Sequence, residues 1–199
     1  MTRTLVDNER GATIVEFGFV APVFMLALVG IFDVSHSLYL RAVLQGIVQK
    51  VGRDSGLETN TTQTARDTLD ARVRAQIIPL ANNATVDITR RFYRTFTDAA
   101  NARPEPWTDT NSNGRCDNGE SYTDNNSNSM WDADGSDGGQ GGAKDKAVYT
   151  VTVTYRPVFP LWRFMGWSNS TQVSATTILA NQPYGDQAVY ATPRVRQCT

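Results

Sequence analysis

Histidine and cysteine are scarce in this chain of 199 residues, which contains one histidine, His36, and two cysteines, Cys116 and Cys198. Zinc sites and Ser–His–Asp or Cys–His catalytic groups need these side chains in larger numbers or at set spacings. The sequence offers none of these patterns and no glycine-rich phosphate loop, and its acidic residues form no pair that can be placed for general acid–base catalysis. We therefore expect no catalytic residues and predict that the protein is not an enzyme.

The two cysteines leave two alternatives open. Outside the membrane, Cys116 and Cys198 could form one disulfide that ties the C-terminal tail to an acidic loop. The other alternative is a pair of reduced thiols, because no second cysteine pair indicates a disulfide framework.

Charge is almost absent from the N-terminal region. From Ala12 to Phe32 the only charged side chain is Glu16. As a helix, these 21 residues would be roughly 31 Å long at about 1.5 Å per residue, which is enough to cross a bilayer core. A carboxylate inside such a span is costly, so Glu16 is a candidate functional residue.

Other interpretations of this segment are open. A cleaved secretory signal would need small residues after the apolar run, and Asp33–Leu38 offers no such site. A signal anchor that is never processed is a second alternative. A buried helix of a soluble protein fits less well, because the run is apolar on every face.

The start of the apolar run matches a class III processing signal. Gly11 and Ala12 form a small pair, and Glu16 is the fifth residue of the apolar segment. Residues 10–45 resemble the TadE-like minor pseudopilins of Tad pilus systems. The resemblance includes Pro22, the Gly30–Asp33 exit and the Leu38–Tyr39 pair, and a weaker match covers Ser174–Pro183, where Gln182 replaces the family's usual glutamate.

This resemblance implies how the protein is processed and where it lies. Prepilin peptidase would remove a leader of residues 1–11, and residues 12–35 would remain as a single transmembrane helix in the inner (plasma) membrane. The head would lie in the periplasm or outside the cell. The partners would be the membrane, other pilins and pseudopilins and the Tad assembly platform, with the protein either held in the membrane or incorporated in the pilus.

The rest of the chain predicts an α+β fold, in which a long N-terminal transmembrane and amphipathic helix leads into a small antiparallel-sheet head, as in pilins. Apolar residues recur with helical period from Leu40 to Val51, so the first helix should continue to Gly52 or Gly56. Two helices broken near Asp33 are the alternative.

Further elements follow from local patterns. Thr64 and Asp67 have capping-box spacing, which predicts a second helix that Pro79 ends. Alternating apolar residues predict strands over 84–93, 149–155 and 172–180. The predicted head covers 36–183, with a calcium-loop insertion at 104–142, and a flexible tail covers 184–199.

An acidic segment interrupts the head. Residues 109–137 contain seven acidic side chains against Arg115 alone, a net charge of −6, so the rest of the chain carries +5 within a total of −1. Such a segment attracts cations and repels nucleic acid.

Within this segment, Asp109–Glu120 satisfies the calcium-loop pattern D-x-[DN]-x-[DN]-G-x₅-E. A second loop, Asp124–Asp132, repeats positions 1, 3, 5 and 9, but it has Ser129 in place of the glycine and Gly135 in place of the glutamate. Asp134 or Asp137 could substitute for that glutamate. The predicted ligands of a structural calcium ion are Asp109, Asn111, Asn113, Asp117, Glu120 and the Arg115 carbonyl in the first loop, and Asp124, Asn126, Asn128, Asp132, Asp134 and the Met130 carbonyl in the second.

These loops are not predicted to be EF-hands, because Pro104 and Pro106 forbid the usual entering helix. They resemble the calcium repeats of extracellular modules, with Cys116 and Trp131 packing inward at position 8. A flexible Asn/Gly/Ser/Asp linker that binds nothing is the alternative.

The segment Phe159–Trp167 carries six large apolar side chains between two strands. It could form a docking patch or touch the membrane interface, or it could fold over the sheet to close the core. For the whole protein, the alternative to a pseudopilin is a signal-anchored, calcium-dependent surface binding module similar to an adhesin.

Overall fold

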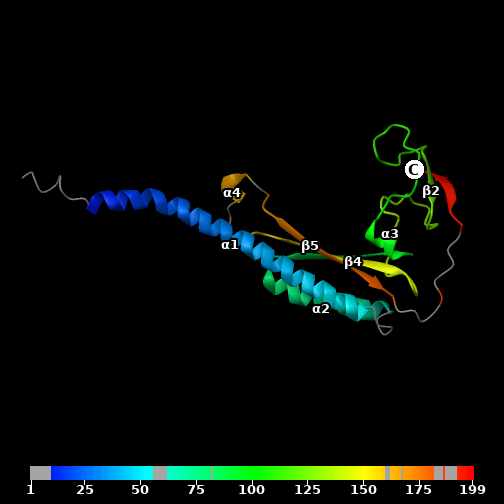
Figure 1. The fold of residues 1–199 in the computed structure, drawn as a ribbon, viewed down its shortest axis with the longest axis horizontal. Helices are drawn as coiled ribbons and strands as arrows, with labels where there is room; N and C mark the ends of the chain where they lie inside the picture. Colours follow the sequence, from blue (N-terminus) through cyan, green and yellow to red (C-terminus); the bar gives the residue numbers. More distant parts are fainter. Residues whose placement is uncertain are drawn as a thin grey trace, which may run out of the picture.

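A computed structural model describes residues 10–55, 62–81, 83–159, 162–166, 168–181, 186 and 192–199 (Figure 1). Its longest element is helix α1, Arg10–Ser55, which contains 46 residues and includes Pro22. The helix is continuous through Asp33, where the Ser37 hydroxyl donates to the Asp33 carbonyl at 2.9 Å. The alternative of two helices broken near Asp33 is therefore wrong.

The end of α1 was predicted closely. The helix ends at Ser55, and Gly56 lies outside the described residues. Gly52 is inside the helix, where an added Cβ would meet the Leu179 side chain at 3.0 Å. The glycine therefore lets the helix approach the sheet closely instead of ending the helix.

Helix α2, Gln63–Ile77, begins one residue before Thr64, the predicted start of the helix. Its N-cap is Thr62, whose side chain accepts a hydrogen bond from the Ala65 N–H at 3.3 Å. The helix ends before Pro79, which lies in a short 3₁₀ turn, η2, Ile78–Leu80. Pro79 is thus at the boundary that the sequence predicted.

The main sheet is antiparallel and has the strand order β3-β1-β4-β5. Its strands are β1, Thr85–Tyr93; β3, Asp137–Gly138; β4, Lys146–Tyr155; and β5, Thr171–Ala180. The three predicted strands are confirmed as β1, β4 and β5. Two-residue β3 was missed, because so short a strand shows no alternation of its own.

The core lies between this sheet and the helices that cover one of its faces (Figure 1). Every second residue of β4 is buried, from Ala147 to Tyr155. The amphipathic part of α1 supplies Leu40, Leu44 and Val48, each with no exposed surface. These observations confirm the α+β class with a long N-terminal helix.

A polar cluster fastens α2 to the sheet. Arg90 of β1 donates to both carboxylate oxygens of Asp70 in α2, at 2.7 and 2.5 Å, and the Tyr149 hydroxyl donates to Asp70 at 2.9 Å. The Arg90 guanidinium also lies 4.8 Å from the centre of the Tyr149 ring. Burial is the main reason that the pKa of Tyr149 is raised, and the Asp70 carboxylate raises it further.

A second, two-stranded sheet lies at the end of the molecule opposite the N-terminus of α1 (Figure 1). It pairs β2, Ser121–Asp124, with β6, Arg194–Gln197. The sequence predicted a flexible tail over 184–199, but residues 194–197 form a strand. The short helices α3, Phe96–Ala100, and α4, Trp162–Met165, complete the described elements.

Candidate functional site

The N-terminal half of α1 is an apolar surface without cover. Phe17, Phe19 and Phe24 are 71%, 76% and 60% exposed. Among the described residues, one helix is long and apolar enough to cross a membrane, and its candidate span is Thr13–Asp54. Its most apolar part has no buried share in this chain, which is consistent with a membrane anchor.

Glu16 lies in this exposed half, within the first two turns of α1. No described residue forms an ion pair with its carboxylate. Gly11 and Ala12, on either side of the predicted cleavage site, also lie in the helix, whereas residues 1–9 of the predicted leader lie outside the described residues. The structure therefore places the predicted processing residues and Glu16 at the N-terminal end of α1.

Three contacts fix α1 to the head just beyond the apolar half. The His36 Nε2 lies 3.0 Å from the Leu80 carbonyl, and the His36 ring packs edge-on against Tyr155. The Ser37 hydroxyl lies 2.8 Å from the Tyr155 hydroxyl. The single histidine thus anchors the helix at the boundary of the head, as an interfacial residue.

The apolar segment 159–167 lies near this boundary as well. The Phe159 N–H donates to the Asp33 carboxylate at 3.4 Å. Phe159 and Trp162 line a cavity of about 750 Å³ together with Leu26 and Gly30 of α1. Phe159 and Trp162 therefore face α1, while Pro160, Leu161 and Trp167 lie outside the described residues.

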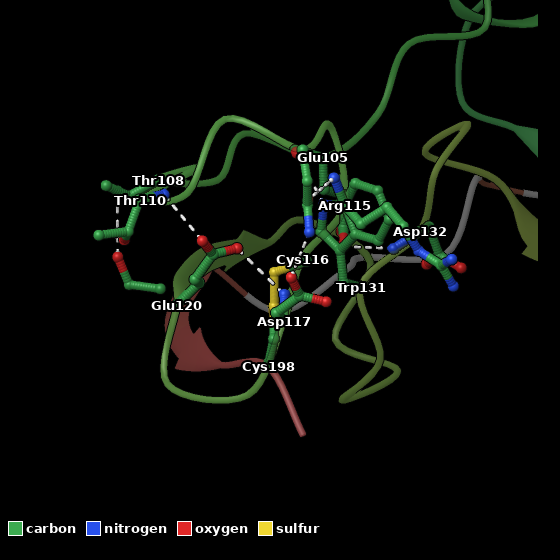
Figure 2. The surroundings of a disulfide bond; sticks show 12 residues. Glu105, Thr108, Thr110, Arg115, Cys116, Asp117, Glu120, Trp131, Asp132 and Cys198 are labelled. Carbon is green, nitrogen blue, oxygen red and sulfur yellow. Dashed lines mark hydrogen bonds between the residues drawn. A yellow bond between two sulfur atoms is a disulfide. The ribbon is translucent and has the colours of Figure 1, made fainter.

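The first acidic loop, Asp109–Glu120, is closed by its own carboxylates. Asp109 at position 1 accepts from the N–H groups of Asn113 and Gly114, at 3.2 and 2.8 Å. Gly114 has φ +75°, a conformation that glycine adopts without steric cost. Glu120 at position 12 is buried and accepts from the Thr110 and Asp117 N–H groups, at 2.7 and 3.0 Å (Figure 2).

The polar side chains of this loop converge on Asp117. The amide Nδ2 atoms of Asn111 and Asn113 both donate to the Asp117 Oδ2, at 2.8 and 2.6 Å. These two hydrogen bonds hold the pKa of Asp117 below its usual value. Side chains at positions 3, 5 and 9 are therefore gathered at one point, as an oxygen-coordinated cation would require.

The second loop, Asp124–Asp132, repeats this arrangement. Asp124 accepts from the Ser129 N–H at 3.1 Å, and Asn126 and Asn128 both donate to the Asp132 Oδ2 at 2.7 Å. Ser129 has φ +68° and thus adopts the left-handed conformation that Gly114 adopts in the first loop. The second loop keeps its shape without the glycine, at the cost of a strained serine.

Asp134 and Asp137, the predicted substitutes for the missing glutamate, make other contacts. Asp134 forms an ion pair with Arg91 and accepts from the Ser136 hydroxyl at 2.7 Å. Asp137 belongs to β3, where its backbone is paired with Phe92. In these contacts neither carboxylate takes the place that Glu120 has in the first loop. Asp137 nevertheless lies near the loop, because burial and then the Asp132 and Asp124 charges raise its pKa.

Glu105 closes the second loop from outside it, and sequence reasoning missed this residue. Its carboxylate accepts from the Asn125 and Asp132 N–H groups, at 2.7 and 3.2 Å. Glu105 is 1% exposed. Burial is the largest cause that raises its pKa, and the nearby Asp132 and Asp124 charges raise it further. The only sequence signal was an acidic residue between Pro104 and Pro106, 19 positions ahead of the loop.

Within the described residues, no group of three or more His, Cys, Asp or Glu side chains is placed to hold a metal ion. In each loop the amide nitrogens of two asparagines point at the aspartate of position 9. Each asparagine Oδ1 accepts a hydrogen bond from the backbone N–H two residues later, and rotating the amide by half a turn would exchange that bond for an Oδ1 facing the aspartate. The loops therefore hold carboxylate and amide oxygens of the kind that calcium prefers.

The disulfide between Cys116 and Cys198 is confirmed, with 5.8 Å between the Cα atoms and a sequence separation of 82 (Figure 2). Backbone hydrogen bonds continue the connection, because the Cys198 N–H donates to the Glu120 carbonyl at 2.8 Å. The C-terminal residues are thus covalently joined to the first acidic loop.

Comparison with known proteins bears on the N-terminal helix alone. The family model described as TadE-like protein matches residues 11–53, which lie within α1 and include Glu16 and the candidate membrane span. No curated protein and no solved structure matches the chain. The predicted resemblance to the TadE-like family is therefore confirmed, and it rests on the segment from Gly11 to Arg53.

Proposed function

We propose that this protein is a minor pseudopilin of a Tad-type pilus, a structural or assembly subunit held in the inner membrane by α1. The observation that carries the proposal is the half-covered helix. Its C-terminal half buries an apolar stripe against the head, its N-terminal half is largely exposed and apolar, and the TadE-like match covers both halves. A surface of this kind is stable in lipid or against the helices of other subunits.

The proposed mechanism uses the charged end of the helix. Prepilin peptidase cleaves between Gly11 and Ala12 and leaves the apolar segment in the mature protein. The new Ala12 amine and the Glu16 carboxylate then neutralise each other between neighbouring subunits. This attraction is stronger in lipid than in water, because the dielectric constant is low.

We further propose that the head lies in the periplasm or outside the cell and that calcium stabilises it. The support is the disulfide, which is typical of an oxidising compartment, and the two closed loops of oxygen donors. Carboxylate, amide and carbonyl oxygens in flexible loops suit calcium better than the smaller magnesium ion.

The test of the assembly mechanism is Glu16→Gln. We expect normal cleavage but loss of cross-linked complexes with other pilin-like subunits, because the uncharged amide cannot neutralise the amine. Asp67→Asn, which removes an exposed carboxylate from α2, is the matched control and should leave the complexes unchanged. Complexes at wild-type level in Glu16→Gln would contradict the proposed pairing.

The acidic loops favour a second candidate, a signal-anchored, calcium-dependent surface binding module. It would share the membrane helix and the calcium loops, but it would keep its N-terminal residues and would need no other pilin. Retention of Met1 in protein extracted from membranes, together with calcium-dependent binding to a surface, would favour this candidate.

A further inference from the structure

We propose that the second acidic loop is a complete calcium site whose last carboxylate ligand is Glu105, supplied from a segment outside the loop. The proposal rests on calcium binding by the head and extends it. It assigns a ligand that the loop pattern does not contain, and it gives the protein two sites of the same design.

The first argument is the equivalence of Glu105 and Glu120. Glu120 accepts hydrogen bonds from the N–H groups at positions 2 and 9 of the first loop, Thr110 and Asp117. Glu105 accepts them from positions 2 and 9 of the second loop, Asn125 and Asp132. Both carboxylates are buried. Glu105 thus stands, relative to its loop, where the bidentate glutamate of position 12 stands in the first loop.

The connection between Glu105 and the second loop is also made by backbone and ring contacts. The Glu105 N–H donates to the Asp132 carbonyl at 2.9 Å, and the Trp131 indole N–H donates to the Glu105 carbonyl at 3.1 Å (Figure 2). The segment around Glu105 is therefore held against the loop by more than its carboxylate.

An independent observation points to a missing partner. Asp124, at position 1 of the second loop, has no exposed surface, and its Oδ1 has no hydrogen-bond partner within the described part of the chain. Arg196 of β6 contacts the other oxygen, Oδ2, at 2.5 Å. A buried carboxylate oxygen without a partner is costly, and a cation ligated by Oδ1 would remove that cost.

The donor set suits calcium. The Asp124 Oδ1, the amide oxygens of Asn126 and Asn128, the Met130 carbonyl and the carboxylates of Asp132 and Glu105 are hard oxygen ligands of the number that calcium takes. Because these ligands come from two segments, binding would join the residues before the first loop to the second loop. Calcium would thereby close the acidic segment upon itself.

The experiment counts ions on the full chain in detergent. Calcium is removed with chelator, then returned, and the bound ions are counted by native mass spectrometry and calorimetry. The second site is followed by terbium luminescence excited through tryptophan, because Trp131 is at position 8 of that loop and its ring lies 5.0 Å from the Trp107 ring.

We expect two ions in the wild type and one in Glu105→Gln, with loss of the tryptophan-excited terbium signal. Glu120→Gln should keep that signal and lose the other ion. Asp134→Asn is the matched control, and it should bind two ions like the wild type. Glu105→Asp keeps the charge but shortens the side chain, and we expect it to weaken the second site by about tenfold or more, because calcium affinity depends on ligand charge and site rigidity.

The outcomes separate the two proposals. A wild type that binds no calcium would overturn calcium binding as a whole. A single ion that Glu120→Gln abolishes and Glu105→Gln leaves intact would overturn the second site alone. Loss of the second ion in Asp134→Asn would also overturn the role of Glu105. If Glu105→Gln fails to fold, two ions of wild-type affinity in Glu105→Asp would overturn it instead.

Discussion

The two halves of α1 both carry large apolar side chains, but these side chains have opposite surroundings. Leu38 is 61% exposed, whereas Leu40, two residues later, has no exposed surface. Before this point most apolar side chains of the helix are exposed among the described residues. Beyond it, apolar side chains of the helix form the core with β4 and β5. The difference indicates that the described head buries its own apolar side chains, whereas the first half of α1 needs a membrane or another subunit to cover them.

The sharpest way to test this comparison is to make the same substitution on both sides of the boundary. Leu40→Ala should lower the free energy of unfolding of the head by about 2–5 kcal/mol, because it leaves a cavity in the core. Leu38→Ala should change it by about 0.5 kcal/mol or less, because the Leu38 side chain is mostly exposed. Chemical denaturation in detergent, followed by tryptophan fluorescence, measures both. Equal losses for the two variants would contradict the boundary.

The disulfide should stabilise the head alone. Replacing Cys198 by serine should lower the free energy of unfolding of the head by about 2–4 kcal/mol, because the bond restricts the unfolded chain. The same denaturation experiment with and without reductant checks this result. The double variant Cys116→Ser with Cys198→Ser is the control and should not respond to reductant. If reductant left the denaturation midpoint of the wild type unchanged, the disulfide would not stabilise the head.

Calcium should stabilise the head by less than the disulfide does. At free calcium ten times the dissociation constant, one site stabilises the folded state by about 1.4 kcal/mol. We therefore expect the melting temperature of the full chain in detergent to be a few degrees higher in millimolar calcium than in chelator. Asp109→Ala combined with Glu120→Ala should remove the part of this rise in melting temperature that the first loop contributes. Asp124→Ala should remove the part that the second loop contributes. Identical melts in calcium and chelator would reduce the segment to an acidic linker.

Much of this fold could be predicted from local sequence patterns. The apolar period of Leu40–Val51 predicted the buried half of α1, and alternation predicted the three long strands. The first acidic loop could be recognised because all of its candidate ligands lie within 12 consecutive residues. Thr62 was missed as the N-cap because Thr64 and Asp67 have capping-box spacing, whereas the residue three positions after Thr62 is Ala65.

The features that sequence reasoning missed depend on contacts between distant segments. Glu105 closes a loop that begins at Asp124, and no spacing rule relates the two. Strand β6 exists because it pairs with β2 and because Cys198 is joined to Cys116. Local composition at the C-terminus carries no sign of these partners, so the tail seemed flexible.

The central claim is that the exposed half of α1 begins a processed pilin-like subunit, and the most direct measurement is the N-terminus of the mature protein. Protein extracted from membranes should be examined by N-terminal sequencing and intact mass in cells with and without active prepilin peptidase. Cleavage between Gly11 and Ala12 predicts a mature chain that begins at Ala12 only when the peptidase is active. Retention of Met1 in both strains, or a start beyond Phe32, would contradict the account.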